Sequence, residues 1–327
     1  MAKKTSISAA TKSRGFTRYK VAVLVPCYNE AVAVAKVVKD FRAALPGATV
    51  FVYDNNSTDN TAAAARAAGA KVFREKHQGK GFVVRRMFTD VEADIYVLVD
   101  GDATYHAPSA PGMIERLLND RLDMVVANRV DRDEAAYRTG HRTGNRLLTS
   151  FVAYVFGSNI NDMLSGYRVF SRRFVKSFPV LSGGFEIETE LTIHALELSL
   201  PVVEIDTPYY SRPIGSASKL NTWGDGFRIL RTIVNIYRAE RPLMFFSAIG
   251  LMLAIASIGF AAPIFVTYTE TGLVPRLPTA ILSTGLMMLA ALSSAVGLVL
   301  DTVTRGRLET KLLAYLAHRA PGEERRA

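Results

Sequence analysis

Residues 97–105 read VLVDGDATY, an apolar run that leads directly into Asp100, Gly101 and Asp102. A short apolar run closed by turn residues is typical of a buried strand. Two carboxylates one residue apart can converge on one ligand if the chain leaves strand geometry between them, and Gly101 permits that turn. Such oxygen pairs suit Mg²⁺ or Mn²⁺. An Asp-x-Asp pair is also common in surface turns, so a metal site and a plain turn remain alternatives.

The chain around this stretch repeats one pattern, a short apolar strand followed by a helical segment. Strands are predicted at residues 21–25, 49–53, 71–73, 94–99 and 124–127. Helices are predicted at residues 30–45, after an N-cap at Ser57 or Thr58, and after Gly79. This alternation requires crossover connections and predicts a mostly parallel sheet with flanking helices. Such sheets bind ligands beyond the carboxyl ends of their strands, where residues 26–30, 54–59 and 100–102 all lie.

The composition narrows the classes of partner. The 327 residues carry a net charge of +10, which suits an anionic partner such as a phosphorylated substrate or a membrane surface. The basic residues lack interleaved aromatics, which argues against nucleic acid. A single cysteine, Cys27, rules out an intrachain disulfide and fits a reducing compartment. Residues 1–19 are basic without an acid, which predicts a disordered arm, either solvated or attracted to a membrane.

The C-terminal part is of a different kind. Residues 243–266 and 277–300 carry no charged side chain, and each run exceeds the roughly 20 residues that span a bilayer. A pair of buried helices in a soluble protein is the alternative. Both flanks are rich in arginine, so the positive-inside rule places them, and the preceding domain, in the cytoplasm. Residues 225–241 form a basic amphipathic pattern, typical of an interfacial helix, although a core-facing helix remains an alternative.

Residues 54–59 read DNNSTD and allow two interpretations. One is an N-capped turn, which Ser57 and Asp59 would satisfy without Asp54. The other gives the Asp54 carboxylate a ligand, since it could accept a ring N–H of uracil or guanine.

Four segments together resemble a known family: VAVLVPCYNE (21–30), VYDNNSTDNT (52–61), HQGKG (77–81) and VLVDGDATY. In this order they resemble the inverting glycosyltransferases of family 2, whose usual patterns are P-x-Y-N-E, D-D-x-S-x-D-x-T, GKG and D-x-D. Asn55 stands where a second Asp is more common. The resemblance implies the α/β fold of nucleotide-diphospho-sugar transferases, called GT-A.

Two later segments resemble a particular branch. DMLSGYR (162–168) and RPIGSASK (212–219) look like the D-x-x-S-G-[FY]-R and R-x-x-G-x-S-K patterns of polyprenyl-phosphate glycosyltransferases, a branch that includes dolichol-phosphate mannose synthase. The second segment has one residue extra. Some members of that branch carry a C-terminal membrane hairpin. The resemblance therefore divides the chain into a basic arm (1–19), a catalytic domain (20–222), a juxtamembrane helix (223–241), a hairpin (242–301) and a cytoplasmic basic tail (302–327).

The implied reaction transfers a sugar from a UDP- or GDP-linked donor to undecaprenyl or dolichyl phosphate, with inversion and with Mg²⁺ or Mn²⁺. Asp100 and Asp102 would hold the metal. The residues expected to bind the donor nucleotide are Pro26, Tyr28, Glu30, Asp54, Lys80, Asp100 and Gly101. The residues expected to bind the acceptor or its phosphate are Arg129, Ser165, Arg168, Arg212, Ser218 and Lys219.

The catalytic candidates beside Asp102 are Asp162 and Glu186. A phosphate monoester is already anionic at neutral pH, so the implied acceptor needs no strong general base. Glu186 alternates with Glu188 and Glu190, and the three could instead mark a helix start, where acids favour the helix dipole. Alternative functions are transfer to another membrane lipid or lipid diphosphate, and a catalytically silent scaffold. Small residues in the first span leave room for a homo-oligomer.

Overall fold

The computed structural model describes residues 18–131, 150, 152, 162–184, 186–213, 231 and 234–322. The chain forms two compact units: Met1–Asp225 together with Lys311–Ala327, and Gly226–Thr310. We call them the catalytic unit and the hairpin unit, and each is described by itself. Residues 1–17 of the predicted basic arm lie outside the described residues.

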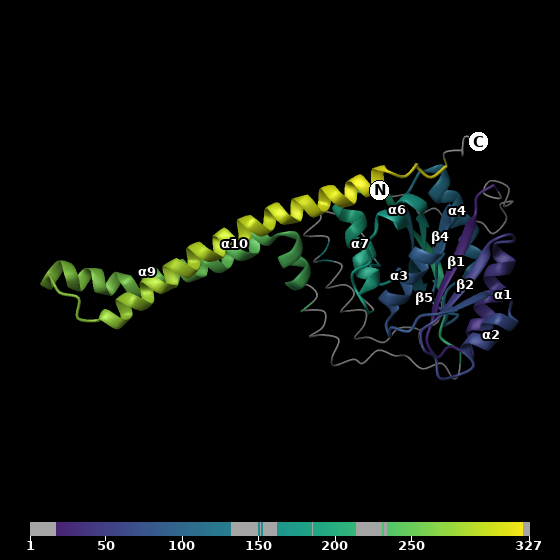
Figure 1. Cartoon of the computed structure of the whole chain (residues 1–327), viewed down its shortest axis with the longest axis horizontal. Helices are drawn as coiled ribbons and strands as arrows, with labels where there is room; N and C mark the ends of the chain where they lie inside the picture. The colour runs from purple at the N-terminus through teal and green to yellow at the C-terminus, as the bar shows by residue number, and fades with distance from the viewer. Residues whose placement is uncertain are drawn as a thin grey trace. The chain divides into compact units, whose positions relative to one another are not determined.

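The catalytic unit is built on one seven-stranded sheet with the order β3-β2-β1-β4-β6-β5-β7 (Figure 1). Its strands are β1 (Val21–Cys27), β2 (Thr49–Asp54), β3 (Lys71–Arg74), β4 (Ile95–Leu98), β5 (Met124–Asp131), β6 (Arg168–Ser171) and β7 (Val202–Tyr209). β6 runs antiparallel to both its neighbours, β4 and β5, whereas the other pairs are parallel. The predicted mostly parallel sheet is confirmed.

Strand β1 shows why these sequences form the centre of the sheet. It is buried along its whole length, so its side chains point alternately into two apolar cores. Val23 belongs to the core on one face and Leu24 to the core on the other. A strand covered on both faces reads as a continuous apolar run. Each such fully buried side chain contributes roughly 1.5–3 kcal/mol.

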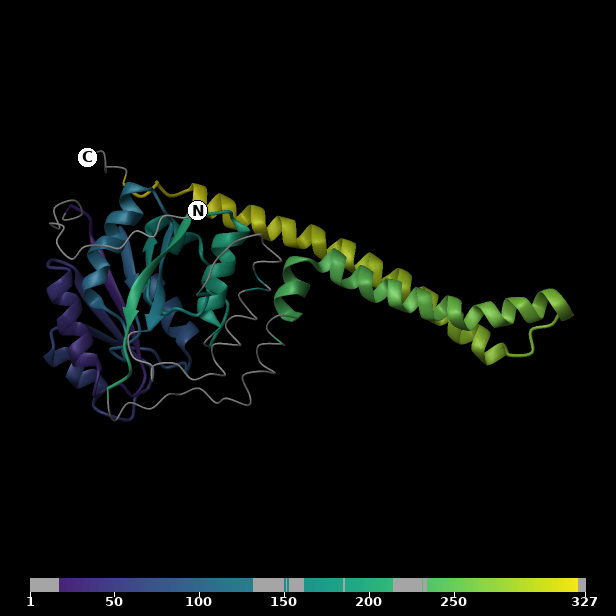
Figure 2. The same cartoon turned by 180° about the vertical axis from the view of Figure 1, so that it is seen from behind.

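Helices cover both faces of the sheet (Figures 1 and 2). The helices α1 (Val34–Ala44), α2 (Thr61–Ala67) and α4 (Ala110–Asn119) contribute to the core that contains Val23. The helices α3 (Lys80–Asp90), α6 (Arg172–Ser177) and α7 (Ile187–Glu197) contribute to the core that contains Leu24. A short 3₁₀ helix, η1 (Ala107–Ser109), precedes α4.

The predicted N-cap of α2 is wrong. The cap is Asn60 rather than Ser57 or Thr58. The Ser57 hydroxyl instead accepts the backbone N–H of Asn29, at 2.9 Å. Thr58 donates its N–H to Asn29 Oδ1, at 2.8 Å. These contacts tie the segment after β2 to the segment after β1.

The hairpin unit contains α9 (Pro242–Thr271) and most of α10 (Leu277–Leu316). Both helices are long and apolar enough to cross a membrane. Small residues bring them together: the Ser257 hydroxyl donates to Ser283 O at 2.7 Å, and Ser293 donates to Phe246 O at 2.8 Å. Many large apolar side chains on both helices are exposed, among them Leu251, Phe265 and Leu298. These helices fit the predicted membrane hairpin.

The flanks of the hairpin differ in how far the structure describes them. Of the predicted juxtamembrane helix, only residues 231 and 234–241 are described, and residues 234–240 are helical. On the other side, the predicted tail begins as helix, because α10 continues to Leu316. Its last residues belong to the catalytic unit, where Lys311 pairs with Glu197 at 2.6 Å and Tyr315 donates to Asp123 at 2.9 Å.

Candidate active site

Three polar segments meet at the end of the sheet that is formed by the carboxyl ends of β1, β2 and β4. β1 and β2 are parallel neighbours in register, so Cys27 lies beside Asp54 at their carboxyl ends. β4 is the other neighbour of β1, and Val99 continues that pairing by donating its N–H to Leu24 O at 3.0 Å. The segments that follow these strands are therefore brought together, as the sequence predicts. We call this end of the sheet the rim.

Asp102 is the most buried carboxylate of the pair that follows β4, with only 4 % of its surface exposed. Its Oδ2 pairs with Arg212 Nη2 at 2.8 Å, and its Oδ1 accepts the Thr104 hydroxyl at 2.7 Å. Burial and the charge of Asp100 raise the pKa of the Asp102 carboxyl, and Arg212 opposes that rise. The site therefore favours a positive charge beside these two carboxylates.

Gly101 allows the turn between them to pack tightly. A Cβ on this residue would lie 2.5 Å from Cys27 Sγ, which is closer than any ordinary contact. Cys27 itself is buried and forms no disulfide. The sequence interpretation of Gly101 as a residue that permits the turn thus has a steric reason as well: the turn lies against β1.

Lys80 supplies the cation for the other carboxylate. Its Nζ lies 2.5 Å from Asp100 Oδ1 and also contacts Glu188 Oε1. Burial alone would lower the pKa of Lys80, but the charges of Asp100 and Glu188 outweigh it and raise that pKa. Glu188 is a residue of this site that the sequence analysis did not single out. Its only sequence signal was its place in the alternating GFEIETEL stretch, which it shares with Glu186 and Glu190.

The three glutamates at the start of α7 have different surroundings. Glu186 is the N-cap residue of the helix and is exposed. Glu190 accepts the backbone N–H groups of Leu181 and Ser182, at 2.7 and 2.9 Å. Glu188 is buried and faces Lys80. The helix start that the sequence left as an alternative is therefore present, and Glu188 joins it to the rim.

Asp54 stands at the end of β2 with 7 % of its surface exposed. Its Oδ1 has no hydrogen-bond partner among the residues that the structure describes. An unpaired buried acceptor costs roughly 1–3 kcal/mol, so a ligand N–H at this point would be favoured. Nearby, Glu30 is also buried, and its N–H donates to the Thr61 hydroxyl at 2.8 Å. Pro26 lies in β1 opposite Tyr53, and Tyr28 is partly buried.

Arg129 and Asp162 form a second charged centre. Arg129 Nε and Nη2 donate to the two oxygens of Asp162, both at 2.7 Å. The Asp162 backbone N–H donates to Glu204 Oε1 at 2.9 Å, and the Arg129 guanidinium lies over the Tyr209 ring. A bidentate pair of this kind strongly favours an ionised carboxylate. Asp162 is thus placed as the partner of Arg129.

Ser165 and Arg168, which the sequence predicts at the acceptor phosphate, are both buried in the structure. Arg168 is 0 % exposed, and its guanidinium donates to the carbonyls of Ser165 and Met163 and to the Thr192 hydroxyl. The Ser165 hydroxyl donates to Ala127 O at 2.7 Å. A sequence pattern shows that an arginine is present but not that its donors are used up by carbonyls. Both side chains hold the loop before β6 in place.

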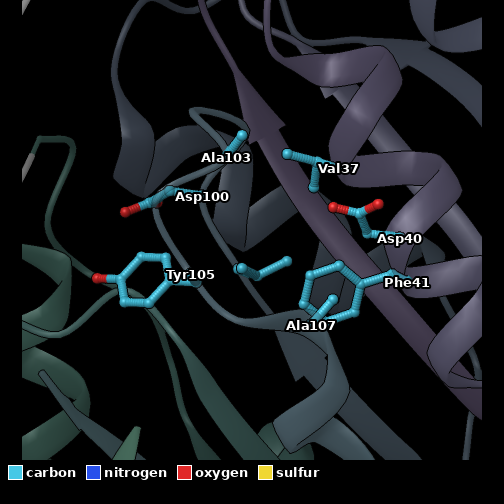
Figure 3. Close-up of a pocket in the computed structure, with 8 residues that line it drawn as sticks. Val37, Asp40, Phe41, Asp100, Ala103, Tyr105 and Ala107 are labelled. Atoms are coloured by element: carbon cyan, nitrogen blue, oxygen red, sulfur yellow. The ribbon is translucent and has the colours of Figure 1, made fainter. Parts of the chain in front are cut away.

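That loop approaches the rim closely. A Cβ on Gly166 would lie 2.3 Å from Asp100 Oδ2, and the Gly166 N–H donates to the Tyr105 hydroxyl at 2.8 Å. A small pocket lies behind the rim and is lined by Asp100, Ala103, Tyr105 and residues of α1. In Figure 3 the Asp100 carboxylate and the Tyr105 hydroxyl point to the same side, while Asp40 lies apart on α1. The predicted Ser218 and Lys219 lie outside the described residues.

The donor set at the rim fits a divalent cation. Asp100 and Asp102 offer carboxylate oxygens, which Mg²⁺ and Mn²⁺ prefer, and both are already paired with side-chain cations. No group of three or more His, Cys, Asp or Glu side chains suited to a metal is found in the described part of the chain. Mg²⁺ is usually held by one or two carboxylates together with substrate phosphates. The two aspartates therefore fit a metal that binds together with a diphosphate.

Comparison with known proteins identifies the family. Residues 22–178 match the model of glycosyl transferase family 2. The chain is 34% identical over 250 residues to glycosyltransferase AglJ of Haloferax volcanii, which covers 76% of this chain and 81% of that protein. It is 26% identical over 226 residues to the dolichyl-phosphate hexose transferase of the same organism, covering 69% and 97%. The chain belongs to glycosyltransferase family 2.

Solved structures support the fold. A glucosyl-3-phosphoglycerate synthase from Mycobacterium tuberculosis, in complex with Mn²⁺, uridine diphosphate and glucosyl-3-phosphoglycerate, aligns with a TM-score of 0.56 and 21% identity. The alignment covers 68% of this chain and 80% of that chain. The catalytic unit therefore has the GT-A type of fold, as the sequence resemblance implied.

Proposed function

We propose that this glycosyltransferase moves a sugar from a nucleotide-diphosphate donor to a polyprenyl phosphate at the membrane surface, with inversion at the anomeric carbon. The observation that carries the proposal is the pair Asp100 and Asp102, each matched by a cation at the rim. The same chain carries two helices of membrane-spanning length. A relative acts, by its name, as a dolichyl-phosphate hexose transferase. These features together favour a lipid phosphate as acceptor.

The donor nucleotide is proposed to bind along the segments that follow β1, β2 and β4. Asp54 offers an unpaired buried oxygen to a base N–H of uracil or guanine. Pro26, Tyr28 and Glu30 line the neighbouring segment. Lys80 lies at the start of α3, where backbone N–H groups and the helix dipole also favour the diphosphate. Gly101, whose turn lies against β1, is proposed to present the two aspartates on either side of it to the ligand.

Asp100 and Asp102 are proposed to hold Mg²⁺ or Mn²⁺ on the donor diphosphate. When bound, such a cation would offset the negative charge that develops on the leaving diphosphate. In the structure, Lys80 forms an ion pair with Asp100, and Arg212 forms one with Asp102. Both side chains are therefore close enough to meet phosphate oxygens once the carboxylates have another partner. Among solved neighbours, the mycobacterial synthase binds Mn²⁺ with uridine diphosphate.

The transfer is proposed as a single displacement. An oxygen of the acceptor phosphate forms a bond to the anomeric carbon while the bond from that carbon to the donor diphosphate breaks. A nucleoside diphosphate leaves, and the lipid phosphate becomes a glycosyl phosphodiester. The attacking oxygen is anionic at neutral pH, so no side chain has to remove a proton. Asp162, which pairs with Arg129, and Glu186, which is exposed at a helix start, are proposed as general bases only for an acceptor that attacks through a hydroxyl group.

The acceptor phosphate is proposed to meet Arg129 and Arg212, together with Ser218 and Lys219. Ser165 and Arg168 are proposed as positioning residues, since they fix the loop that carries Gly166 against Asp100. Holding two reactants in the correct orientation is itself a large part of catalysis. The catalytic unit is proposed to lie in the cytoplasm, because arginines flank the hairpin on both sides.

The test uses the full chain purified in detergent. It is incubated with Mn²⁺ or Mg²⁺ and a panel of UDP- and GDP-sugars, with polyprenyl phosphate, polyprenyl diphosphate or a glycolipid as acceptor. We expect a glycosylated lipid with polyprenyl phosphate, detected by mass spectrometry. Product with only another lipid would contradict the proposed acceptor. No product with any acceptor, from a preparation that binds nucleotide, would support the silent scaffold.

A further inference from the structure

Asn55 uses its side chain to hold the loop that precedes Lys80. The residue is buried, with 3 % of its surface exposed. Its Nδ2 donates to the carbonyls of His77 at 2.7 Å and Glu75 at 3.3 Å. Its Oδ1 accepts the Gly79 backbone N–H at 2.7 Å and lies 3.5 Å from Gln78 Nε2. One amide thus binds the loop of residues 75–79 along its length.

This loop determines where Lys80 begins α3. Gly79 is the N-cap residue and has φ +140. A Cβ on Gly79 would lie 2.1 Å from Gly183 O, and one on Gly81 would lie 2.1 Å from Ser182 O. The backbone on both sides of Lys80 therefore lies tightly against the segment before α7. On its other side the loop is held by Asn55. Because Lys80 reaches Asp100 from this start, a shift of the loop would move its ammonium group.

The contacts require an amide rather than a carboxylate. Two carbonyl oxygens face Nδ2, and only a donor satisfies them. A carboxylate in that place would face two acceptors without a proton and would leave them unpaired in a buried site. Asp is more common at this position in the pattern that the sequence resembles. The amide of Asn55 is therefore a feature of this chain that its own loop explains.

We propose that Asn55 is a positioning residue for nucleoside diphosphate binding, through the loop that presents Lys80. The proposal rests on the proposed function in one respect, that the ligand at the rim is the diphosphate of a nucleotide sugar. It does not depend on which lipid accepts the sugar. It follows that replacing Asn55 by a residue that cannot donate a hydrogen bond to the loop weakens the binding of the nucleotide.

The test compares wild type and Asn55→Asp, as full chains in detergent, by calorimetric titration with UDP or GDP and Mn²⁺ at about pH 8 and about pH 5.5. At pH 8 we expect the variant to bind at least about ten-fold more weakly, the effect of losing one buried hydrogen bond. At pH 5.5 the deficit should narrow to about three-fold. Burial and the facing carbonyls raise the pKa of the new carboxyl, and its protonated form can donate.

The charged groups around this position are the same in both proteins. Asp54 is the preceding residue, and Glu75 and His77 belong to the loop, with His77 Nδ1 3.0 Å from Glu75 Oε1. The quantity to compare is therefore the ratio of the two dissociation constants at each pH, in which changes common to both proteins cancel.

Asn56→Asp is the matched control. Asn56 also binds the loop through its amide, which donates to Lys76 O at 2.6 Å, but this contact is exposed. Water can replace an exposed hydrogen bond, and Asp tolerates the positive φ of this position. We expect this variant to stay within about two-fold of wild type at both pH values. A loss as large as that of Asn55→Asp would show a general sensitivity of the loop and overturn the proposal.

Three further outcomes are decisive. Wild-type affinity of Asn55→Asp at pH 8 would overturn the proposal, and so would an equal deficit at both pH values. If the variant unfolds at pH 8, it is purified at pH 5.5 and compared there with Asn55→Ala, which has no donor at any pH. Equal affinities of these two variants would overturn the proposal.

A wild type that binds UDP or GDP but transfers no sugar to polyprenyl phosphate would contradict only the proposed function.

Discussion

The partly buried ion pairs of the rim connect single residues to the proposed function. Lys80 forms ion pairs with both Glu188 and Asp100, and Arg212 forms an ion pair with Asp102. Buried charges are costly unless they are paired, so these side chains stabilise one another while no other ligand is present. In the proposed complex, the divalent cation would supply the positive charge beside the carboxylates. The diphosphate would supply the negative charge beside Lys80 and Arg212. The residues that we propose to bind the donor therefore also stabilise the site through their ion pairs.

His194 gives a prediction about stability at low pH. The residue is 1 % exposed, lies against Phe174 and Phe178, and has Nε2 3.2 Å from Ser177 Oγ. Burial, with the nearby charge of Lys311, lowers the pKa of His194 to about 4. In the unfolded chain the pKa is near 6.5, so only the unfolded chain binds the proton between these values. Stability should fall by about 3 kcal/mol as the pH drops from 6.5 to 4.

The measurement is the thermal unfolding midpoint of the full chain in detergent, between pH 7.5 and pH 4.5. Asn or Gln at position 194 does not titrate in this range, so His194→Gln should show a shallower decline on acidification. Equal declines in wild type and His194→Gln would contradict this account of the buried imidazole.

The sequence identified part of the rim, and the reason is chemical. Asp100 and Asp102 could be found because they directly follow a predicted strand, and Lys80 because its segment resembles the GKG pattern of the family. Glu188 was missed because only the packing of α7 distinguishes it from the acids beside it. Arg168 was expected at the acceptor phosphate because its segment resembles the D-x-x-S-G-[FY]-R pattern, whereas its burial depends on strand β6 and α7 and could not be predicted.

At the level of elements, the loop before β6 limits how Asp100 can move. The Gly166 backbone approaches the Asp100 carboxylate so closely that an added Cβ would lie 2.3 Å from Oδ2. Gly166→Ala should displace this carboxylate. We expect sugar transfer to fall by about ten-fold or more, since small misplacements at a reacting centre are costly. The Mn²⁺ concentration that gives half-maximal rate should rise.

The comparison for this prediction is Gly306→Ala, a glycine of α10 with nothing within 4 Å of an added Cβ. Steady-state transfer rates across a Mn²⁺ titration should leave Gly306→Ala near wild type. A Gly166→Ala variant with unchanged rate and unchanged Mn²⁺ requirement would show that Asp100 tolerates the crowding and is not fixed by this loop.

The elements themselves were predictable where the sheet is parallel and doubly covered. β1, β2, β4 and β5 contain apolar runs because both of their faces are buried. β6 was not predicted because it begins with a charged residue, Arg168. The guanidinium of Arg168 is buried and donates hydrogen bonds to backbone carbonyls. β7 lies at the edge of the sheet, and its alternating VVEIDTPY pattern is the sequence signal from which it could have been predicted.

In the whole molecule, the chain returns to the catalytic unit after the hairpin. The side chain of Lys311 pairs with Glu197, and Tyr315 donates to Asp123 while Arg173 lies over its ring, 4.6 Å from the centroid. Glu197 and Asp123 are nearly or fully buried carboxylates. Lys311→Met should therefore destabilise the catalytic unit by about 1–3 kcal/mol, the cost of removing a partner from a buried polar group.

Arg307→Met is the control for this change, because Arg307 is an exposed residue of the same helix. The unfolding midpoint of the full chain in detergent should drop for Lys311→Met and stay within the error of wild type for Arg307→Met. Equal midpoints for the two variants would mean that the returning segment does not stabilise the catalytic unit.

The most direct measurement of the central claim is sugar transfer to polyprenyl phosphate by wild type, Asp102→Asn and Asp120→Asn, with saturating Mn²⁺. Asp102→Asn keeps the size of the side chain but removes the charge that faces Arg212. Asp120 belongs to a surface pair with Arg116 on α4 and serves as the control. The account predicts a loss of at least about a hundred-fold for Asp102→Asn and an unchanged rate for Asp120→Asn. Normal formation of the lipid-linked sugar by Asp102→Asn would contradict it.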